Sequence, residues 1–464
     1  MASSDAVLAL LTQVNEDSKA IVREQSKLDL ESYIRNYTER TRFERLIHIG
    51  LTSVPLCIES LKAAVNEAKL GTDTPRYKEA WDLLRKVAPN EPEAQRDETW
   101  IEETDKTAKS VTSHLETVLK GYKNNLVKES IRMTNEELGK HFEKVGKLPA
   151  ATEAFGRMRQ DVSTTKQIVD CSLLLAGIAL QRKDWPSAVA HATKVWSMPN
   201  VQEHSGSVGT SRIIAGVGYI GQGNYTEAAR NFLMADYATS PSDYSHIASP
   251  NDIAVYGGLL SLATMDRNSL QSRVLESQNF RSFLETEPQI RKAISLFVNG
   301  RYSACLAILE STRADYLLDI YLFKHVQDLY AKIRSKCIMQ YFIPFSCVTL
   351  ESLESAFAAP GASLEDELLA MIRQGTLKAK IDTKNRLLVA VQPDPRAEMQ
   401  RQALQVAHGY EKEATERLRR MGIVCSGLEV VGPKKAQAHG QVFTPGLTMD
   451  SSFLEESQAA EGWS

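Results

Sequence analysis

The feature that most constrains this chain is a phrase of turn and helix residues that recurs along its first 340 positions. In each copy a short turn precedes a large apolar residue, which is followed three positions later by a small one. The pairs are Tyr77 and Ala80, Leu148 and Ala151, Trp185 and Ala188, Tyr225 and Ala228, and Tyr302 and Cys305. Because residues three apart share a helix face, the large side chain can fill the groove between two helices, and the small one lets them approach closely.

The spacing of these phrases predicts a repeat architecture. Successive large residues are 71, 37, 40 and 77 positions apart, close to one or two units of 36 to 40 residues. That period is typical of helical hairpins stacked into a tetratricopeptide-like solenoid. An all-helical bundle in which turn residues recur by chance is the alternative. We assign an N-terminal helical region to 1–130 and the repeats to 131–318.

Composition and charge narrow the class of protein. The 464 residues are 43% hydrophobic and 24% charged, which is typical of a globular chain. With 55 Lys and Arg against 58 Asp and Glu, the net charge of −3 offers no general basic excess for binding duplex nucleic acid. Six cysteines without a C-x-x-C pair favour reduced core thiols in an intracellular protein. We expect neither a signal peptide nor a membrane span, since the longest apolar stretch, 168–180, is shorter than the ~20 residues a bilayer needs.

A different module follows residue 346. Ser363 is the expected N-cap of one of its helices and Gly375 the residue that ends it. The order of elements is typical of a winged helix, which we assign to 319–395. The expected elements are a leading helix at 319–341, a short strand at 348–350, helices at 351–357 and 363–374, and a hairpin with strands at 377–381 and 387–391.

One more helix is expected after the winged helix, within a segment that we assign to 396–425. Its apolar residues step by three or four, as in the stripe of a coiled coil. They are Met399, Ala403, Val406, Tyr410, Ala414, Leu418 and Met421. We expect this stripe to join a helix bundle with partner subunits, and packing back on the winged helix is the alternative. Residues 432–464 are rich in Gly, Pro, Gln, Ala and Ser and are expected to be disordered.

Catalytic motifs are missing from the sequence. It contains no H-E-x-x-H, no phosphate-binding G-x-x-x-x-G-K-[ST] and no G-x-S-x-G, so we predict no catalytic, cofactor-binding or metal-binding residues. Residues 216–221 match the bare G-x-G-x-x-G pattern inside a predicted helical hairpin, which favours close helix packing over a nucleotide site. The helix expected at 363–374 carries Glu365, Asp366 and Glu367 in its first turn, which would repel a DNA backbone.

The combination of a helical-repeat body, a winged helix and one long helix resembles the PCI-domain scaffold family shared by the proteasome lid, the COP9 signalosome and a translation-initiation factor. Signature-like stretches at 249–264, 319–330, 340–345 and 364–368 are similar to those of the signalosome's first-subunit family and its proteasome-lid sister. Two further stretches, 28–46 and 122–132, resemble the signalosome family specifically.

This resemblance implies a non-catalytic scaffold in the cytoplasm and nucleus. Such a subunit would support removal of the ubiquitin-like modifier NEDD8 from cullin-RING ubiquitin ligases, with the metalloprotease in another subunit and no cofactor here. A proteasome-lid PCI scaffold subunit and a winged-helix nucleic-acid adaptor are the alternatives.

The implied partners are other PCI subunits, bound through winged-helix strand edges and a bundle of C-terminal helices. Cullin-RING ligases would be engaged indirectly, and neither nucleic acid nor a membrane would be bound. The hairpin and the last helix supply the residues that we expect to meet these partners. They are Leu377, Ile381, Val389, Met399, Ala403, Val406, Tyr410, Leu418 and Met421.

Overall fold

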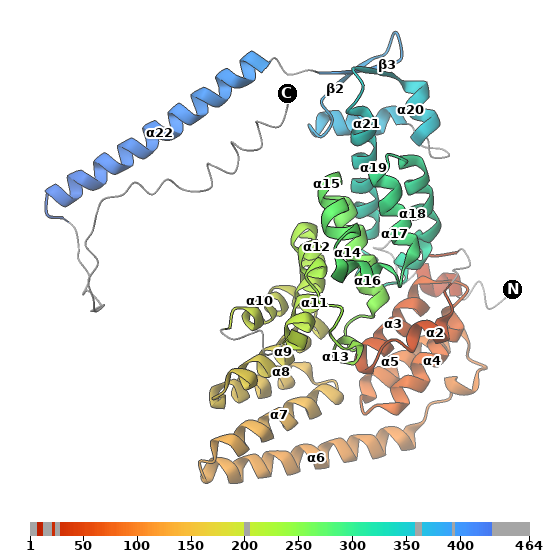
Figure 1. Cartoon of the computed structure of the whole chain (residues 1–464). Coiled ribbons are helices and arrows are strands. Elements are labelled where there is room, and N and C mark those ends of the chain that lie inside the picture. Colours follow the sequence, from red (N-terminus) through yellow and green to blue (C-terminus); the bar gives the residue numbers. More distant parts are fainter. Residues whose placement is uncertain are drawn as a thin grey trace. The chain divides into compact units, whose positions relative to one another are not determined.

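The protein is helical with one small sheet, as a computed structural model shows (Figure 1). The structure describes residues 7–12, 21–23, 28–198, 205–357, 364–391 and 395–428. The chain divides into two compact units, at residues 1–391 and 392–464. The expected combination of helical repeats and a small winged-helix module is confirmed.

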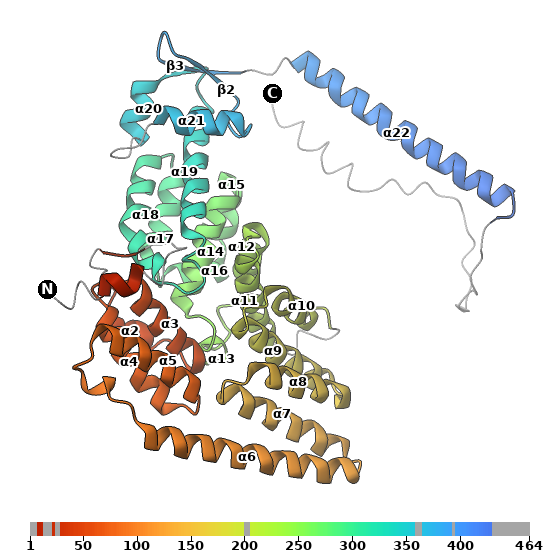
Figure 2. The same cartoon turned by 180° about the vertical axis from the view of Figure 1, so that it is seen from behind.

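The first part of the larger unit is a helical bundle with its own core around Leu46, Leu61 and Leu84. A 27-residue helix then leads from this bundle to the repeats (Figures 1 and 2). These helices are α2 (Leu30–Ile34), α3 (Glu39–Thr52), α4 (Cys57–Leu70), α5 (Thr74–Val87), the short 3₁₀ helix η1 (Pro92–Ala94) and the long α6 (Glu98–Asn124).

Antiparallel helical hairpins make up the middle of the larger unit. The first three pairs are α7 (Lys128–Lys144) with α8 (Leu148–Met158), α9 (Thr165–Gln181) with α10 (Trp185–Trp196), and α11 (Ser205–Gly221) with α12 (Tyr225–Leu233), and the 3₁₀ helix η2 (Arg159–Asp161) follows α8. The elements that follow are α13 (Pro241–Tyr244), α14 (Pro250–Thr264), α15 (Arg267–Ser269), the π-helix η4 (Leu270–Leu275), α16 (Gln278–Leu284), α17 (Pro288–Val298), α18 (Tyr302–Leu317) and α19 (Val326–Phe342).

The recurring phrase does what its pattern predicts. Each large residue lies in the first turn or two of a helix, at the start of α8, α10, α12 and α18 and inside α5. The small residues Ala80, Ala151, Ala188, Ala228 and Cys305 have no exposed surface. The helix-packing interpretation of the phrase is therefore confirmed.

Four of the hairpin turns share one backbone conformation. Gly146, Lys183, Gly223 and Gly300 have φ between 58° and 84°, each two residues before the large residue. In the turn at Gly223, its N–H donates to the Ile220 carbonyl at 2.8 Å and the next N–H donates to Tyr219 at 3.0 Å. This pairing closes a helix with a left-handed residue, a conformation that costs an L-residue about 1–2 kcal/mol but is free of strain for glycine. Lys183 is thus the strained member of the series.

We expect Lys183→Gly to raise the free energy of unfolding by about 1 kcal/mol, because it relieves this strain without removing a contact that the fold uses. Gly223→Ala is the reciprocal change, at a turn where an added Cβ meets no atom within 4 Å. It should lower the free energy of unfolding by a similar amount. Urea unfolding followed by circular dichroism measures both, and equal stability of the two variants would contradict the explanation.

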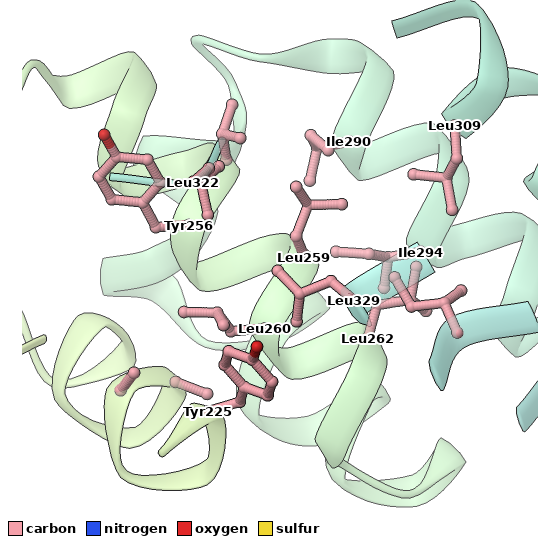
Figure 3. Packing of buried hydrophobic residues seen from close by; sticks show 14 of the residues in the cluster. Tyr225, Tyr256, Leu259, Leu260, Leu262, Ile290, Ile294, Leu309, Leu322 and Leu329 are labelled. Atoms are coloured by element: carbon pink, nitrogen blue, oxygen red, sulfur yellow. The ribbon is translucent and has the colours of Figure 1, made fainter. Parts of the chain in front are cut away.

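The largest hydrophobic core runs from the repeats into the winged helix. Its centre is α14, which is buried on nearly every side. Figure 3 shows Leu259 and Leu262 of α14 among residues of α17, α18 and α19, including Ile294 and Leu329. The repeats and the winged helix therefore share one continuous core.

The G-x-G-x-x-G stretch lies within helix α11, as expected. A Cβ on Gly216 would lie 2.7 Å from the Phe232 ring, and one on Gly218 would lie 2.7 Å from Val189. These distances are too short for a side chain, so the glycines allow close approach of α10 and α12. The packing interpretation is confirmed.

The winged helix completes the larger unit. Its sheet has the order β1-β3-β2 with both pairs antiparallel, and Gly375 ends α21 with φ of +74° as expected. The expected N-cap, Ser363, lies outside the described residues. The elements after α19 are β1 (Cys347–Thr349), α20 (Leu350–Phe357), α21 (Leu364–Arg373), β2 (Ala379–Asp382) and β3 (Leu387–Ala390).

The leading helix is shorter than the sequence predicts. It begins at Val326 rather than at Asp319. The Asp319 Oδ1 atom accepts hydrogen bonds from the N–H groups of Tyr321 and Leu322, both at 2.9 Å, and thereby stabilises a separate turn before the helix. Helical spacing of apolar residues cannot distinguish this turn from a helix.

The smaller unit contains helix α22 (Pro395–Cys425). Cys425 and Cys347 are exposed free thiols, whereas the other four cysteines are buried, so the expectation of core thiols holds for four of the six. The tail that we expect to be disordered, from 432 onward, lies outside the described residues.

Candidate functional site

A buried ionic junction joins the N-terminal bundle to the repeats. Arg45 on α3 is completely buried. Its Nη1 donates to Asp319 Oδ2 at 2.7 Å, and its Nη2 donates to Asp252 Oδ2, on α14, at 2.9 Å. Arg45 lies 207 positions before Asp252 and 274 positions before Asp319 along the chain. One guanidinium thus fixes the bundle against both α14 and the turn before α19.

Tyrosines enclose this junction. The Tyr37 hydroxyl donates to Asp252 at 2.7 Å and the Tyr256 hydroxyl donates to Asp319 at 2.6 Å. The Arg45 guanidinium lies 4.0 Å from the centre of the Tyr37 ring, within cation–π range. The polar atoms of the two carboxylates are thereby satisfied without water.

The two carboxylates of the junction differ in acidity. Burial raises the pKa of Asp252 despite the neighbouring Arg45. Burial also acts on Asp319, but Arg45, the Tyr256 hydroxyl and the Leu322 N–H outweigh it and hold the pKa of Asp319 below its usual range. The Arg45 pKa stays well above normal, because Asp252, the tyrosines Tyr33 and Tyr37, and Asp319 together overcome its burial. Arg45 is therefore a permanent cation at the centre of the junction.

Nearby, His48 extends the same contact. Its Nε2 lies 3.2 Å from the Leu317 carbonyl and its ring lies 4.6 Å from that of Phe323. Burial lowers the pKa of His48 to about 4, so the ring is neutral near pH 7. The bundle thus contacts the end of α18 through the neutral His48 and the turn before α19 through the charged Arg45.

A groove of about 1080 Å³ lies beside the junction, between the bundle and helices α7, α9 and α11. Charges of both signs line it, and Asp73 pairs with Arg40 at 3.2 Å and with Arg76 at 3.3 Å. No group of three His, Cys, Asp or Glu side chains suited to a metal ion occurs among the residues that the structure describes.

The three-stranded sheet changes one prediction about the winged-helix edge. The sequence predicts that Val389 lies on a strand edge open to a neighbouring subunit. In the structure β3 is the central strand, and Val389 is paired with Cys347 on β1 and with Lys380 on β2. That prediction was wrong, because the short strand expected at 348–350 lies at 347–349 and pairs with β3, a pairing that the sequence pattern does not reveal. The outer strands of the sheet are β1 and β2.

The other two hairpin residues pack inward. Leu377 is buried and belongs to the core of the larger unit, and Ile381 on β2 is half-buried against that core. Since its own module buries the Leu377 side chain, a partner could meet this strand only through its backbone edge, and the contact stays a prediction. Only the Val389 side chain, 38% exposed, faces solvent.

Helix α22 presents the remaining predicted residues. Met399, Ala403, Val406, Tyr410, Leu418 and Met421 are all exposed, with Val406 61% and Leu418 69% exposed. Leu404, which the predicted stripe does not include, is also exposed. Burying one such side chain against a partner contributes about 1.5–3 kcal/mol. Helix α22 therefore offers several exposed apolar side chains that a partner can bury.

The sequence does not reveal Arg45 as the centre of a junction. The stretches at 28–46, 249–264 and 319–330 were recognised only as resembling a family, and the structure shows that they meet around this one guanidinium. A signal was available, because Arg45 shares a helix face with the apolar Ile49, and a charge on a buried face requires partners.

Two family models and several known proteins match this chain. Residues 97–273 match the family described as 26S proteasome subunit RPN7, and residues 309–391 match the PCI domain. The COP9 signalosome complex subunit 1 of Neurospora crassa is 51% identical over 397 residues, covering 85% of this chain and 90% of the relative. The chain belongs to the COP9 signalosome complex subunit 1 family.

More distant members of the subunit 1 family match over a similar length. The Arabidopsis thaliana protein is 32% identical over 402 residues, covering 86% of this chain and 90% of the relative. The proteasome sister is less similar: the regulatory subunit RPN7 of Saccharomyces cerevisiae is 24% identical over 261 residues, which cover 55% of this chain and 60% of that protein. No helix within the described part of the chain is long and apolar enough to cross a membrane.

Proposed function

We propose that this chain is a non-catalytic scaffold subunit of the COP9 signalosome. In this role it supports removal of NEDD8 from cullin-RING ubiquitin ligases by a metalloprotease located in another subunit. The observation that carries the proposal is the match to subunit 1 proteins along 85% of the chain, combined with an exposed apolar helix after the PCI domain.

The mechanism of such a scaffold is mechanical. The Arg45 junction and the continuous core hold the bundle, repeats and winged helix as one support, and α22 offers apolar side chains for a bundle of C-terminal helices. The outer strands β1 and β2 offer backbone groups for strand pairing with a neighbouring PCI module. Residence in the cytoplasm and nucleus is part of the proposal.

A proteasome-lid role has less support, because the relative named for that complex matches about half of the chain. A nucleic-acid adaptor has less still. The first turn of α21 carries three acids, of which Glu367 is paired with Arg334 at 2.9 Å. Neither alternative has an observation that favours it over the signalosome.

Affinity purification of the tagged full-length chain from its own cells tests the proposal. We expect signalosome subunits to co-purify in constant ratio with the chain. Recovery of proteasome-lid subunits in their place, or of the chain alone, would contradict it. Immunofluorescence of the same tagged chain tests the expected distribution between cytoplasm and nucleus.

A further inference from the structure

The turn between α6 and α7 is an exposed surface that the scaffold role leaves unused. Every residue from 120 to 129 is exposed, including the apolar residues Tyr122, Leu126 and Val127. Leu126 is 82% exposed. Both views in Figures 1 and 2 show this turn at the end of the α6–α7 hairpin that points away from helices α2 to α5. A leucine in this position gains nothing from the fold of its own chain.

Leu126 also has a strained backbone. Its φ of +55° is the left-handed conformation that glycine occupies at Gly146, Gly223 and Gly300. The hydrogen bonds are of the same kind, because the Leu126 N–H donates to Lys123 at 3.2 Å and the Val127 N–H donates to Tyr122 at 3.3 Å. Glycine would close this turn at lower energy. Residues strained in this way cluster at functional sites, and Leu126, unlike Lys183, combines the strain with an exposed apolar side chain.

The charge around Leu126 is positive. Lys120, Lys123 and Lys128 are exposed, and no ion pair involves them among the described residues. The acid nearest in sequence, Glu129, is already bound by Arg132 at 2.7 Å. The turn therefore presents an apolar centre with a basic border, which is complementary to an acidic peptide that carries apolar side chains.

We propose that the α6–α7 turn, residues 120–129, docks an acidic, apolar segment of a partner protein, with Leu126 as the central contact. The inference rests on the proposed function only in placing that partner within the assembled complex. A second copy of this turn would bring lysines against lysines, which the charge disfavours.

The partner segment can be identified by cross-linking. A photo-reactive amino acid at Asn125, next to Leu126, is introduced into the tagged full-length chain, and the complex is irradiated in cells, purified and analysed by mass spectrometry. The control carries the same group at Lys106, in the first half of α6, whose side chain is 79% exposed. We expect a cross-link from position 125 to one acidic, apolar segment of another protein. A result no stronger than the control, or a link to a basic segment or to a second copy of this chain, would overturn the proposal.

Three variants then test the contact against a synthetic peptide of that segment. Leu126→Gly should weaken peptide binding about tenfold to hundredfold, because it removes a buried leucine side chain. It should also raise the melting temperature of the chain by about 1–2 °C, because it relieves the strain. Opposite changes in binding and stability exclude unfolding as the cause. Lys183→Gly, the matched control, should raise stability and leave binding unchanged.

The third variant, Lys123→Gln with Lys128→Gln, should weaken binding and reduce its dependence on salt. Wild-type affinity of the Leu126→Gly variant for the peptide would overturn the proposal. The proposal would also fail if the wild-type chain floated with phosphatidylserine vesicles and the double lysine variant did not, because that result would assign the turn to a membrane. Failure of the proposed function is separately visible, since the chain would then not co-purify with signalosome subunits.

Discussion

Replacing Arg45 with methionine is expected to lower the free energy of unfolding by about 3–5 kcal/mol, because it leaves two buried carboxylates without their cation. Asp252 and Asp319 keep their tyrosine partners, but hydroxyl groups cannot neutralise their charge. Urea unfolding at pH 7.5 measures the effect. The control is Arg35→Met, which removes the ion pair between Arg35 and Glu31, where the Arg35 side chain is 71% exposed. This change should cost less than about 0.5 kcal/mol.

The loss should depend on pH in a defined direction. Arg45 lowers the pKa of both Asp252 and Asp319, so its removal raises both values above that of an unfolded aspartate. An acid whose pKa is raised by folding stabilises the protein at low pH, and this contribution is lost as pH rises through the folded-state pKa. The destabilisation by Arg45→Met should therefore be smaller at pH 5 than at pH 8. A loss that is equal at both pH values, or larger at pH 5, would show that the guanidinium does not act through these acids.

The second large effect is expected at α22. Val406→Gln combined with Leu418→Gln should weaken incorporation of the chain into its complex about 100-fold or more, because two apolar contacts of 1.5–3 kcal/mol each are lost. Both side chains are exposed, so the melting temperature of the isolated chain should not change. Competition between tagged variant and untagged wild-type chain for the other subunits measures incorporation.

Lys412→Gln combined with Arg419→Gln is the matched control for α22, since it introduces the same residue on the charged side of the helix. It should incorporate as the wild type does. Truncation after Pro395 should weaken incorporation without unfolding the larger unit, whereas truncation after Gly432 should do neither. Equal loss of incorporation in both double variants would contradict an interface made by the apolar stripe. A lower melting temperature of the Val406→Gln and Leu418→Gln variant would assign the stripe to intramolecular packing.

Local patterns predicted most of this fold because each repeat is defined within about 40 residues. The large and small pairs, such as Tyr225 with Ala228, identify helix starts from sequence alone, and the structure buries them as expected. The winged helix was predictable for the same reason, since its helices and hairpin have local signals. Partner contacts of α22 remain predictions.

Long-range pairing was not predictable in this way. The strand at Cys347–Thr349 pairs with a strand 40 residues later, and only that pairing makes Val389 central. Arg45 meets Asp252 and Asp319 across 207 and 274 positions, and no periodicity in the sequence connects them. The type of an apolar side chain already predicts that it is buried. A charged side chain is buried only where the fold brings partners to it, and the sequence around it does not show those partners.

The most direct test of the scaffold role is a deneddylation assay with a NEDD8-modified cullin and a complex assembled from purified subunits. Three samples are compared: the isolated chain, the complex without it, and the complex with it. We predict no activity for the isolated chain, which should also bind no stoichiometric zinc, reduced activity when the chain is omitted, and recovery when it is added back. NEDD8 removal by the isolated chain, or full activity of the complex that lacks it, would contradict the proposed function.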